Sequence, residues 1–293
     1  MGAFCMKLTE LFRDERITLS FEVFPPKTDA SFASVVSATE KIAALQPAYM
    51  SVTYGAGGSN SKATIEVAAN LIRRYGVPVT AHLTCVGASR DSVDAQLLQM
   101  QQAGIDNILA LRGDLPQDAA PDVTAAFPHA SDLIAYVKQR GDFCIGGACY
   151  PEVHPESASQ REDLRYLKEK VDAGCDYLVT QMFFDNNIYY NFLYKAREAG
   201  ITVPVVPGVM PITRANQIGR AVALSGTNVP ARFRQIVDVF GARPEAMKQA
   251  GIAYATEQIV DLLANGVRHV HVYSMNKPDV AAAILQNVSE LIR

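Results

Sequence analysis

The sequence predicts one α/β domain folded as a closed (β/α)8 barrel, on three observations. Short apolar runs alternate with helix-period segments along the whole chain of 293 residues. Four of these runs follow an Ala-Gly or Asn-Gly junction, where the glycine can end a helix. Most of the runs end in residues that can do chemistry. The expected strands cover residues 18–24, 49–54, 78–84, 107–112, 143–150, 177–183, 203–209 and 269–275.

The segments between these strands have helical spacing, as residues 159–172 illustrate. Residues 115–128, rich in proline and alanine, are expected to form a long loop over the site. Residues 227–244 are expected to be an irregular insertion before the final helix and strand. No linker divides the chain, so residues 1–293 should form one catalytic domain.

The residue pattern within the strands favours the barrel over a doubly wound open sheet. In the first, third and last strands, aliphatic residues alternate with polar ones such as Glu22, His82 and His271. An open parallel sheet is covered by helices on both faces and needs aliphatic side chains on both. A barrel covers one face with helices and turns the other inward. We therefore expect the polar face to line the interior.

The composition excludes several classes of protein. Hydrophobic residues make up 49% of the chain and charged residues 19%, which indicates a packed globular protein. The net charge of −3 and the lack of a basic stripe give no reason to expect nucleic acid. No apolar run is long enough to cross a bilayer. Five cysteines without a CxxC pair favour the reducing cytoplasm.

Two strand ends carry charged groups with a possible catalytic role. Glu22 lies in an apolar strand, where desolvation favours the protonated form and suits a proton donor. The alternative is a carboxylate paired with a neighbouring arginine or lysine. Arg112 and Asp114 flank Gly113. They could form a local ion pair or bind the polar edge of a heterocycle, and the sequence leaves both open.

Motifs of other enzyme classes are absent or weak. The glycine-rich residues 55–59 precede a helix, but Asn60 stands where the dinucleotide-binding fingerprint needs glycine. A tight turn is expected there instead. Glu152, His154 and Glu156 contain ligand atoms for a metal but lack HExxH support. We therefore expect no metal.

Eight segments form one ordered pattern that covers almost the whole chain: 20–27 (SFEVFPPK), 51–56 (SVTYGA), 81–85 (AHLTC), 111–116 (LRGDLP), 148–156 (ACYPEVHPE), 170–174 (KVDAG), 180–185 (TQMFFD) and 207–211 (PGVMP). This pattern resembles the methylenetetrahydrofolate reductase family in its bacterial, single-domain form. The resemblance implies a flavoprotein that reduces 5,10-methylenetetrahydrofolate to 5-methyltetrahydrofolate. FAD would carry the hydride from NADH or NADPH, and both substrates would use the flavin in turn (ping-pong).

The resemblance also implies roles for individual residues. Glu22 matches the acid that helps to open the five-membered ring of the folate. Asp114 matches an acid near the pyrimidine edge of the flavin that also meets the pterin. The positions that match contacts to the flavin or nicotinamide are Thr53, Tyr54, Ala56, His82, Arg112, Gly113, Asp114, Ala130, Tyr150, His154, Asp163 and Lys170.

The implied substrate contacts are Asp114, Gln181, Gln217 and Lys277. Lys277 stands where bacterial relatives have arginine, so a forked contact to the folate becomes a point charge. Ala221 falls where some relatives place a phenylalanine that stacks on ligands. We also expect the chain to assemble with copies of itself.

Two other function classes remain open. A barrel lyase or aldolase would use a lysine Schiff base, but no lysine lies inside an expected strand. A pterin-binding module would have lost catalysis. Bound flavin would exclude the first class, and anaerobic bleaching of that flavin by a nicotinamide would argue against the second.

Overall fold

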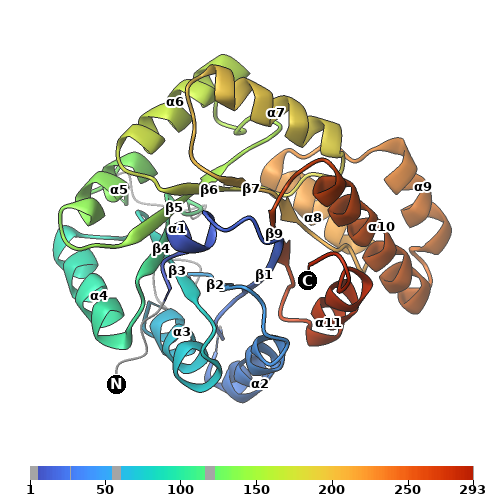
Figure 1. Cartoon of the computed structure of the whole chain (residues 1–293), viewed down its shortest axis with the longest axis horizontal. Coiled ribbons are helices and arrows are strands. Elements are labelled where there is room, and N and C mark those ends of the chain that lie inside the picture. Colours follow the sequence, from blue (N-terminus) through green and yellow to red (C-terminus); the bar gives the residue numbers. More distant parts are fainter. Residues whose placement is uncertain (1–5, 27, 55–60, 116–122, 293) are drawn as a thin grey trace.

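The computed structural model describes residues 6–26, 28–54, 61–115 and 123–292. All paired strands are parallel, and they form one ring surrounded by helices (Figure 1). The order around the ring is β7-β6-β5-β4-β3-β2-β1-β9-β8. The strands are β1 (Thr18–Val23), β2 (Met50–Val52), β3 (Val79–Thr84), β4 (Asn107–Leu111), β5 (Cys144–Cys149), β6 (Tyr177–Thr180), β7 (Val205–Val206), β8 (Gly208–Val209) and β9 (His269–Tyr273).

The short segments β7 and β8 are one strand path interrupted at Pro207. The first pairs with β6 and the second pairs with β9, so together they close the ring. Proline has no N–H to donate. Its carbonyl oxygen still accepts a hydrogen bond of 2.9 Å from the N–H of His271. The observed strands therefore match the eight expected ones, and the (β/α)8 barrel is confirmed.

Helices follow the strands in the expected alternation. Glycines at positive φ follow α4, α6, α7 and α10, as the repeated junction predicts. The helices are α1 (Leu8–Leu11), α2 (Phe32–Ala43), α3 (Ser61–Tyr75), α4 (Arg90–Ala103), α5 (Ala130–Lys138), α6 (Gln160–Asp172), α7 (Asn186–Glu198), α8 (Asn216–Ser225), α9 (Ala231–Phe240), α10 (Pro244–Ala264) and α11 (Pro278–Asn287), with a 3-10 turn at Asp29–Ser31. None of the helices in the described ranges is long and apolar enough to cross a membrane.

The prediction of an irregular insertion over residues 227–244 was wrong, because α9 forms within it. Phe233 of this helix is buried against Phe184, Ile212 and Met247. This second apolar cluster stabilises a helix whose start follows a proline-containing loop.

The strand faces divide as the alternation predicts. The aliphatic face of β1, β3 and β9 belongs to the main core, together with apolar side chains of the surrounding helices. The opposite face points inward and contains buried Ser20, Ser51, Thr80, His82 and His271. The barrel therefore has a column of polar side chains in its interior. Barrels of this fold usually fill the same space with branched aliphatic side chains.

Helix α1 closes the N-terminal end of the barrel. In Figure 1 it lies across the centre of the ring. Leu8 and Leu11 pack in a cluster with Tyr49 and Tyr177, which come from inside the barrel. The N–H of Leu8 donates a 2.8 Å hydrogen bond to the side chain of Asn107 at the start of β4. Ligands must therefore approach from the opposite end, where the strands finish.

Candidate active site

Glu22 sits near the end of β1 at the top of the polar column. Its side chain is 22% exposed, and its Oε2 lies 3.6 Å from Nε2 of His82 and 4.0 Å from Nε2 of His271. Each histidine is held from a neighbouring strand: His82 Nε2 lies 2.6 Å from Ser51 Oγ, and His271 Nδ1 lies 2.7 Å from Ser20 Oγ. Within the described ranges, the basic side chains within 4.0 Å of the Glu22 carboxylate are these histidines, and no arginine or lysine forms an ion pair with it. The carboxylate is therefore oriented but free of a fixed cation.

Burial keeps His82 in its neutral form. Desolvation lowers its pKa to about 4, although the nearby carboxylate of Glu22 opposes the shift. The side chain is only 6% exposed. At neutral pH the ring is therefore an uncharged hydrogen-bonding group beside Glu22.

This burial predicts a pH-dependent stability. The folded pKa of His82, about 4, lies below the ordinary value of 6.5. Between these pH values the unfolded chain binds a proton that the folded chain does not, so the free energy of unfolding should rise with pH there. The contribution amounts to roughly 3 kcal/mol. Urea unfolding at several pH values should show a flatter rise in His82→Gln than in the parent or in His129→Gln, a change at an exposed histidine. Equal slopes in all three proteins would contradict the assignment.

Arg112 follows β4 and is held by Glu156 from the loop after β5. The guanidinium forms a forked ion pair with the carboxylate, and the bond from Nη2 to Oε1 is 2.8 Å. This hydrogen bond raises the pKa of Arg112. Asp114 remains exposed nearby. Arg112 therefore pairs with Glu156 and not with Asp114, the partner that one of the two alternatives gave it, and Asp114 stays available to a ligand.

The glycine between these two residues is required by the backbone. Gly113 has φ +87°, and a Cβ there would lie 3.2 Å from Cβ of Thr84. A side chain would be strained and crowded at this turn. The turn brings Arg112 and Asp114 to the same edge of the barrel mouth.

Tyr150 and His154 form an aromatic pair after β5. Their rings meet edge to face with centroids 4.6 Å apart. Asp163 of α6 accepts a 3.2 Å hydrogen bond from the N–H of His154, and Nδ1 of His154 accepts one of 3.1 Å from the N–H of Glu156. Burial raises the pKa of Tyr150, which a hydrogen bond with Gln181 opposes. The loop thus presents two rigid rings beside Arg112.

Two carboxylates of this loop have protein partners. Glu152 Oε2 accepts a 2.9 Å hydrogen bond from the N–H of Asn228, while Glu156 pairs with Arg112. Among the residues that the structure describes, no group of three histidine, cysteine, aspartate or glutamate side chains is arranged to hold a metal.

The remaining flavin positions lie around the same rim with mixed exposure. Lys170 donates a 2.7 Å hydrogen bond from Nζ to the carbonyl of Ala148, below the strand end. Tyr54 donates to Gln96 at 3.0 Å, and Ala130 is the first residue of α5. Thr53 directly follows β2. Ala56 lies outside the described residues.

The substrate positions Gln217 and Lys277 meet at Thr213. Oε1 of Gln217 accepts hydrogen bonds from the N–H groups of Thr213 and Arg214 at 2.9 and 2.8 Å. Lys277 Nζ donates to Thr213 Oγ1 at 2.5 Å. Burial lowers the pKa of Lys277, and Arg214 lowers it further. Ala221, which lies one turn after Gln217 on α8, is buried.

Two structural contacts at the rim were not anticipated from the sequence. The amide of Asn276 pairs with the backbone of Phe24, accepting at 3.0 Å and donating at 2.9 Å. Tyr273 donates a 2.5 Å hydrogen bond to the carbonyl of Thr180 across the barrel. A Cβ on Gly208 would overlap Tyr273, so this crossing needs the glycine. The only sequence signal for the contact of Asn276 was its position two residues before Pro278. In the structure Asn276 has a φ of 51°.

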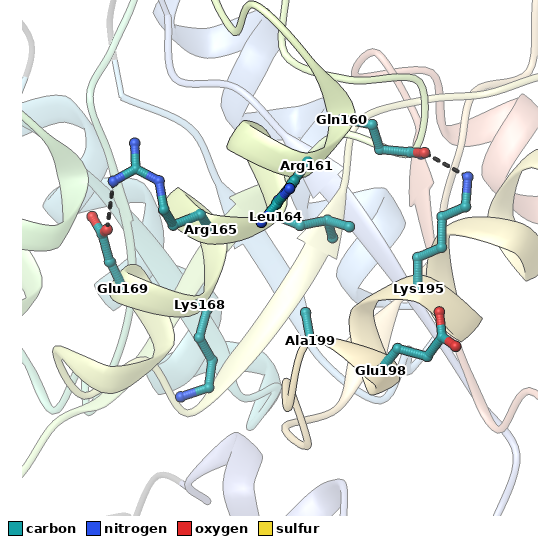
Figure 2. A pocket seen from close by; sticks show the side chains of 9 residues that line it. All are labelled: Gln160, Arg161, Leu164, Arg165, Lys168, Glu169, Lys195, Glu198 and Ala199. Atoms are coloured by element: carbon teal, nitrogen blue, oxygen red, sulfur yellow. Dashed lines mark hydrogen bonds and ion pairs between the residues drawn. The ribbon is translucent and has the colours of Figure 1, made fainter.

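A groove of about 640 Å³ lies away from the mouth, between α6 and α7 (Figure 2). Two pairs of lining side chains meet across or along it: Lys195 donates to Gln160 at 2.5 Å, and Arg165 donates to Glu169 at 3.3 Å. These residues are on helices, not at strand ends. The groove therefore does not contribute to the site at the mouth.

Comparison with known proteins identifies the family of the chain. The family model "Methylenetetrahydrofolate reductase" matches residues 7–289. The chain is 36% identical over 295 residues to "Probable methylenetetrahydrofolate reductase (NADH)" of Oryza sativa subsp. japonica, covering 96% of this chain and 50% of the relative. It is 34% identical over 270 residues to "5,10-methylenetetrahydrofolate reductase" of Escherichia coli (strain K12), covering 92% and 90%. The chain thus spans about half the length of its plant relatives.

A solved structure supports the fold independently. It is an uncharacterized protein from Clostridium thermocellum that binds two copies of 5-methyl-5,6,7,8-tetrahydrofolic acid. It superposes with a TM-score of 0.68 at 16% identity, covering 97% of this chain and 98% of the other. The family match over nearly the whole chain, together with the bacterial relatives of similar length, shows that the chain belongs to the methylenetetrahydrofolate reductase family.

Proposed function

We propose that this protein reduces 5,10-methylenetetrahydrofolate to 5-methyltetrahydrofolate, using FAD and a reduced nicotinamide, NADH or NADPH. The observation that carries the proposal is Glu22, a partly exposed carboxylate near the C-terminal end of β1 with two histidines within 4.0 Å. An acid is needed at this place because the leaving ring nitrogen must gain a proton when the folate ring opens.

The residues on β4 to β6 fit FAD. Arg112 is held by a carboxylate that is 58% exposed, so a flavin phosphate could replace this anion with the same forked geometry. The rings of Tyr150 and His154 offer apolar edges beside it. We place the isoalloxazine over the strand ends and the rest of the cofactor along this side. Bound there, FAD would supply a hydride carrier that serves the two substrates in turn.

The other residues would bind and orient the substrate. Gln181, at the end of β6 and hydrogen-bonded to Tyr150, would meet the pterin together with Asp114. Gln217 and Lys277 lie on the β8 and β9 side of the rim and would hold the remainder of the folate. Glu22 would then face the nitrogen that leaves the five-membered ring.

Flavin content and anaerobic spectroscopy test this function directly. The purified protein should be yellow, and NADH or NADPH should bleach the flavin absorbance in the absence of oxygen. Adding methylenetetrahydrofolate should restore the absorbance and yield 5-methyltetrahydrofolate. A colourless protein that cannot be loaded with FAD, or reduced flavin that does not react with the folate, would refute the proposal.

Cellular context completes the proposal. Four cysteines are buried free thiols, which supports a reducing compartment such as the cytoplasm: Cys85, Cys144, Cys149 and Cys175.

We also propose that the protein forms a homo-oligomer. Light scattering on the purified holoenzyme gives the mass that tests it.

Asp114→Asn should make the flavin easier to reduce. A carboxylate close to the flavin ring opposes the negative charge that develops on reduction. Removing about 1 kcal/mol of this repulsion should raise the two-electron potential by about 20 mV. Equilibration with a reference dye measures the shift. Asp238→Asn, a change at an exposed residue of α9, serves as the control, and an equal potential in both variants would contradict the placement.

A further inference from the structure

We propose that Asn276 is a positioning residue for Glu22. Its amide, together with the hydroxyl of Ser274, fixes the end of β1 so that the carboxylate of Glu22 faces the folate when the ring opens. The inference rests on the proposed function and adds to it a residue that acts through the acid. The structural element involved is the turn after β9, residues 274–277, called the β9 turn below.

The backbone of the β9 turn is unusual for its sequence. The carbonyl of Ser274 accepts a 3.0 Å hydrogen bond from the N–H of Lys277, and the two residues between them, Met275 and Asn276, have φ of 52° and 51°. A turn with positive φ at both central residues favours glycine, asparagine or aspartate. Met275 breaks this rule, and its side chain is 39% exposed, so burial does little to stabilise it. Such a conformation persists where other contacts fix it.

The contacts that fix the β9 turn go to the end of β1. Ser274 is buried, and its Oγ donates a 2.6 Å hydrogen bond to the carbonyl of Glu22. The amide of Asn276 accepts a 3.0 Å hydrogen bond from the N–H of Phe24 and donates one of 2.9 Å to the carbonyl of the same residue. Three side-chain hydrogen bonds therefore fix the backbone at Glu22 and two residues beyond it.

These bonds begin where the pairing of β1 with β9 ends. The last paired residues on this side are Glu22 and Tyr273, whereas on the other side of β1 the pairing with β2 continues to Val23. Beyond Phe24, the sequence continues with Pro25 and Pro26, which have no N–H for a strand ladder. The β9 turn thus extends the support of β1 past its last paired residue.

The carboxylate of Glu22 depends on this support for its direction. Its Oε2 lies 3.6 Å from Nε2 of His82 and 4.0 Å from Nε2 of His271, and neither distance is that of a direct hydrogen bond. The backbone that carries Glu22 therefore has a large share in aiming the side chain. Proton transfer is sensitive to this aim, because a displacement of about 1 Å can slow a reaction by about a hundredfold.

Asn276→Gly tests the role, because glycine tolerates the positive φ and removes only the amide. In the FAD-loaded holoenzyme, a nicotinamide should reduce the flavin at nearly the parent rate. Reoxidation by methylenetetrahydrofolate should be about tenfold to a hundredfold slower. Ser274→Ala should slow the same step to a smaller extent. The matched control is Asn265→Gly at an exposed asparagine after α10, whose Nδ2 donates to the carbonyl of Asp261 at 2.9 Å. This control should change neither rate.

A double-mutant cycle shows whether Asn276 acts through Glu22. Residues that act as one unit do not have additive effects. In the Glu22→Gln background, Asn276→Gly should therefore slow reoxidation by the folate no further. An additive loss in the double variant, or an equal slowing of flavin reduction and reoxidation in the single variant, would overturn the positioning role.

Hydrogen exchange at Phe24 gives a readout that does not depend on turnover. Because Pro25 and Pro26 have no N–H, a peptide that covers residues 23–26 reports few amides. Exchange at Phe24 should be faster in Asn276→Gly than in the parent. Asn276→Asp should keep the protection, since its carboxylate can still accept the bond. Unchanged exchange in Asn276→Gly would contradict the contact.

The parent enzyme separates failure of this inference from failure of the proposed function. If the parent flavin is reduced by a nicotinamide and reoxidised by the folate, but Asn276→Gly is reoxidised equally fast, the positioning role is overturned and the proposed function stands. If the parent itself carries out neither step, both proposals fail.

Discussion

Glu22→Gln should keep FAD and accept electrons from the nicotinamide at nearly the parent rate, but transfer them to methylenetetrahydrofolate about a hundredfold to ten-thousandfold more slowly. Reduction of the flavin needs only correct stacking of the nicotinamide. Opening the folate ring also needs a proton on the leaving nitrogen. Glutamine keeps the size of Glu22 beside His82 and His271, but it cannot donate that proton.

Rapid anaerobic mixing separates the two half-reactions, because flavin absorbance falls in the first and returns in the second. Glu66→Gln is a suitable control, since Glu66 is on α3 and pairs only weakly with Lys62 at 3.8 Å. If Glu22→Gln is reoxidised by the folate as fast as the parent, the acid lies elsewhere. If it loses flavin reduction as well, Glu22 serves the structure of the mouth, not the second half-reaction alone.

The second large effect is expected at Gly251, in the middle of α10. A Cβ at this position would overlap the carbonyl group of Ile212, so the helix packs directly on the backbone of the loop after β8. Backbone atoms cannot rotate away as a side chain can. Gly251→Ala should therefore lower the free energy of unfolding by about 3 kcal/mol, at the upper end for overpacking. It should also displace Thr213 and raise KM for the folate.

Gly219→Ala provides the matched control for this prediction. Gly219 is also inside a helix, α8, but a Cβ there would meet no atom within 4 Å and its φ is not positive. Alanine should therefore stabilise that helix, by up to about 1 kcal/mol. Urea unfolding of both variants measures the difference. Equal stabilities would show that the contact between α10 and residue 212 can relax without loss.

The strand positions could be predicted because apolar and polar side chains alternate with a period of two along each strand. Alternation placed Glu22, His82 and His271 on the inner face, and the structure confirms this. It could not show which of them meet, because that depends on the stagger between strands. Glu22 is level with Ser51 and Tyr273, and this register brings its side chain to His82 and His271. His269, on the same face of β9, lies deeper and contacts Thr18 at 2.8 Å.

Two other features depended on tertiary contacts. The helix α9 was missed although Phe233, Ile236, Val237 and Phe240 have helical spacing, and their burial depends on a cluster with residues from distant segments. The sequence also could not predict that Gln217 and Lys277 lie close together. Both side chains hydrogen-bond to Thr213, and the loop that carries Thr213 is fixed by contacts with α8 and α10.

The closure of the ring between β1 and β9 has a consequence for how the chain acquires its fold during synthesis. These strands pair in parallel, and Thr18 meets His269 across 251 positions. On the ribosome, β1 emerges early and keeps one edge open until nearly all the other strands have been made. Such distant pairing is slow to form, and an open edge can pair with another chain. The nascent barrel should therefore depend on chaperones that shield β1 until β9 arrives.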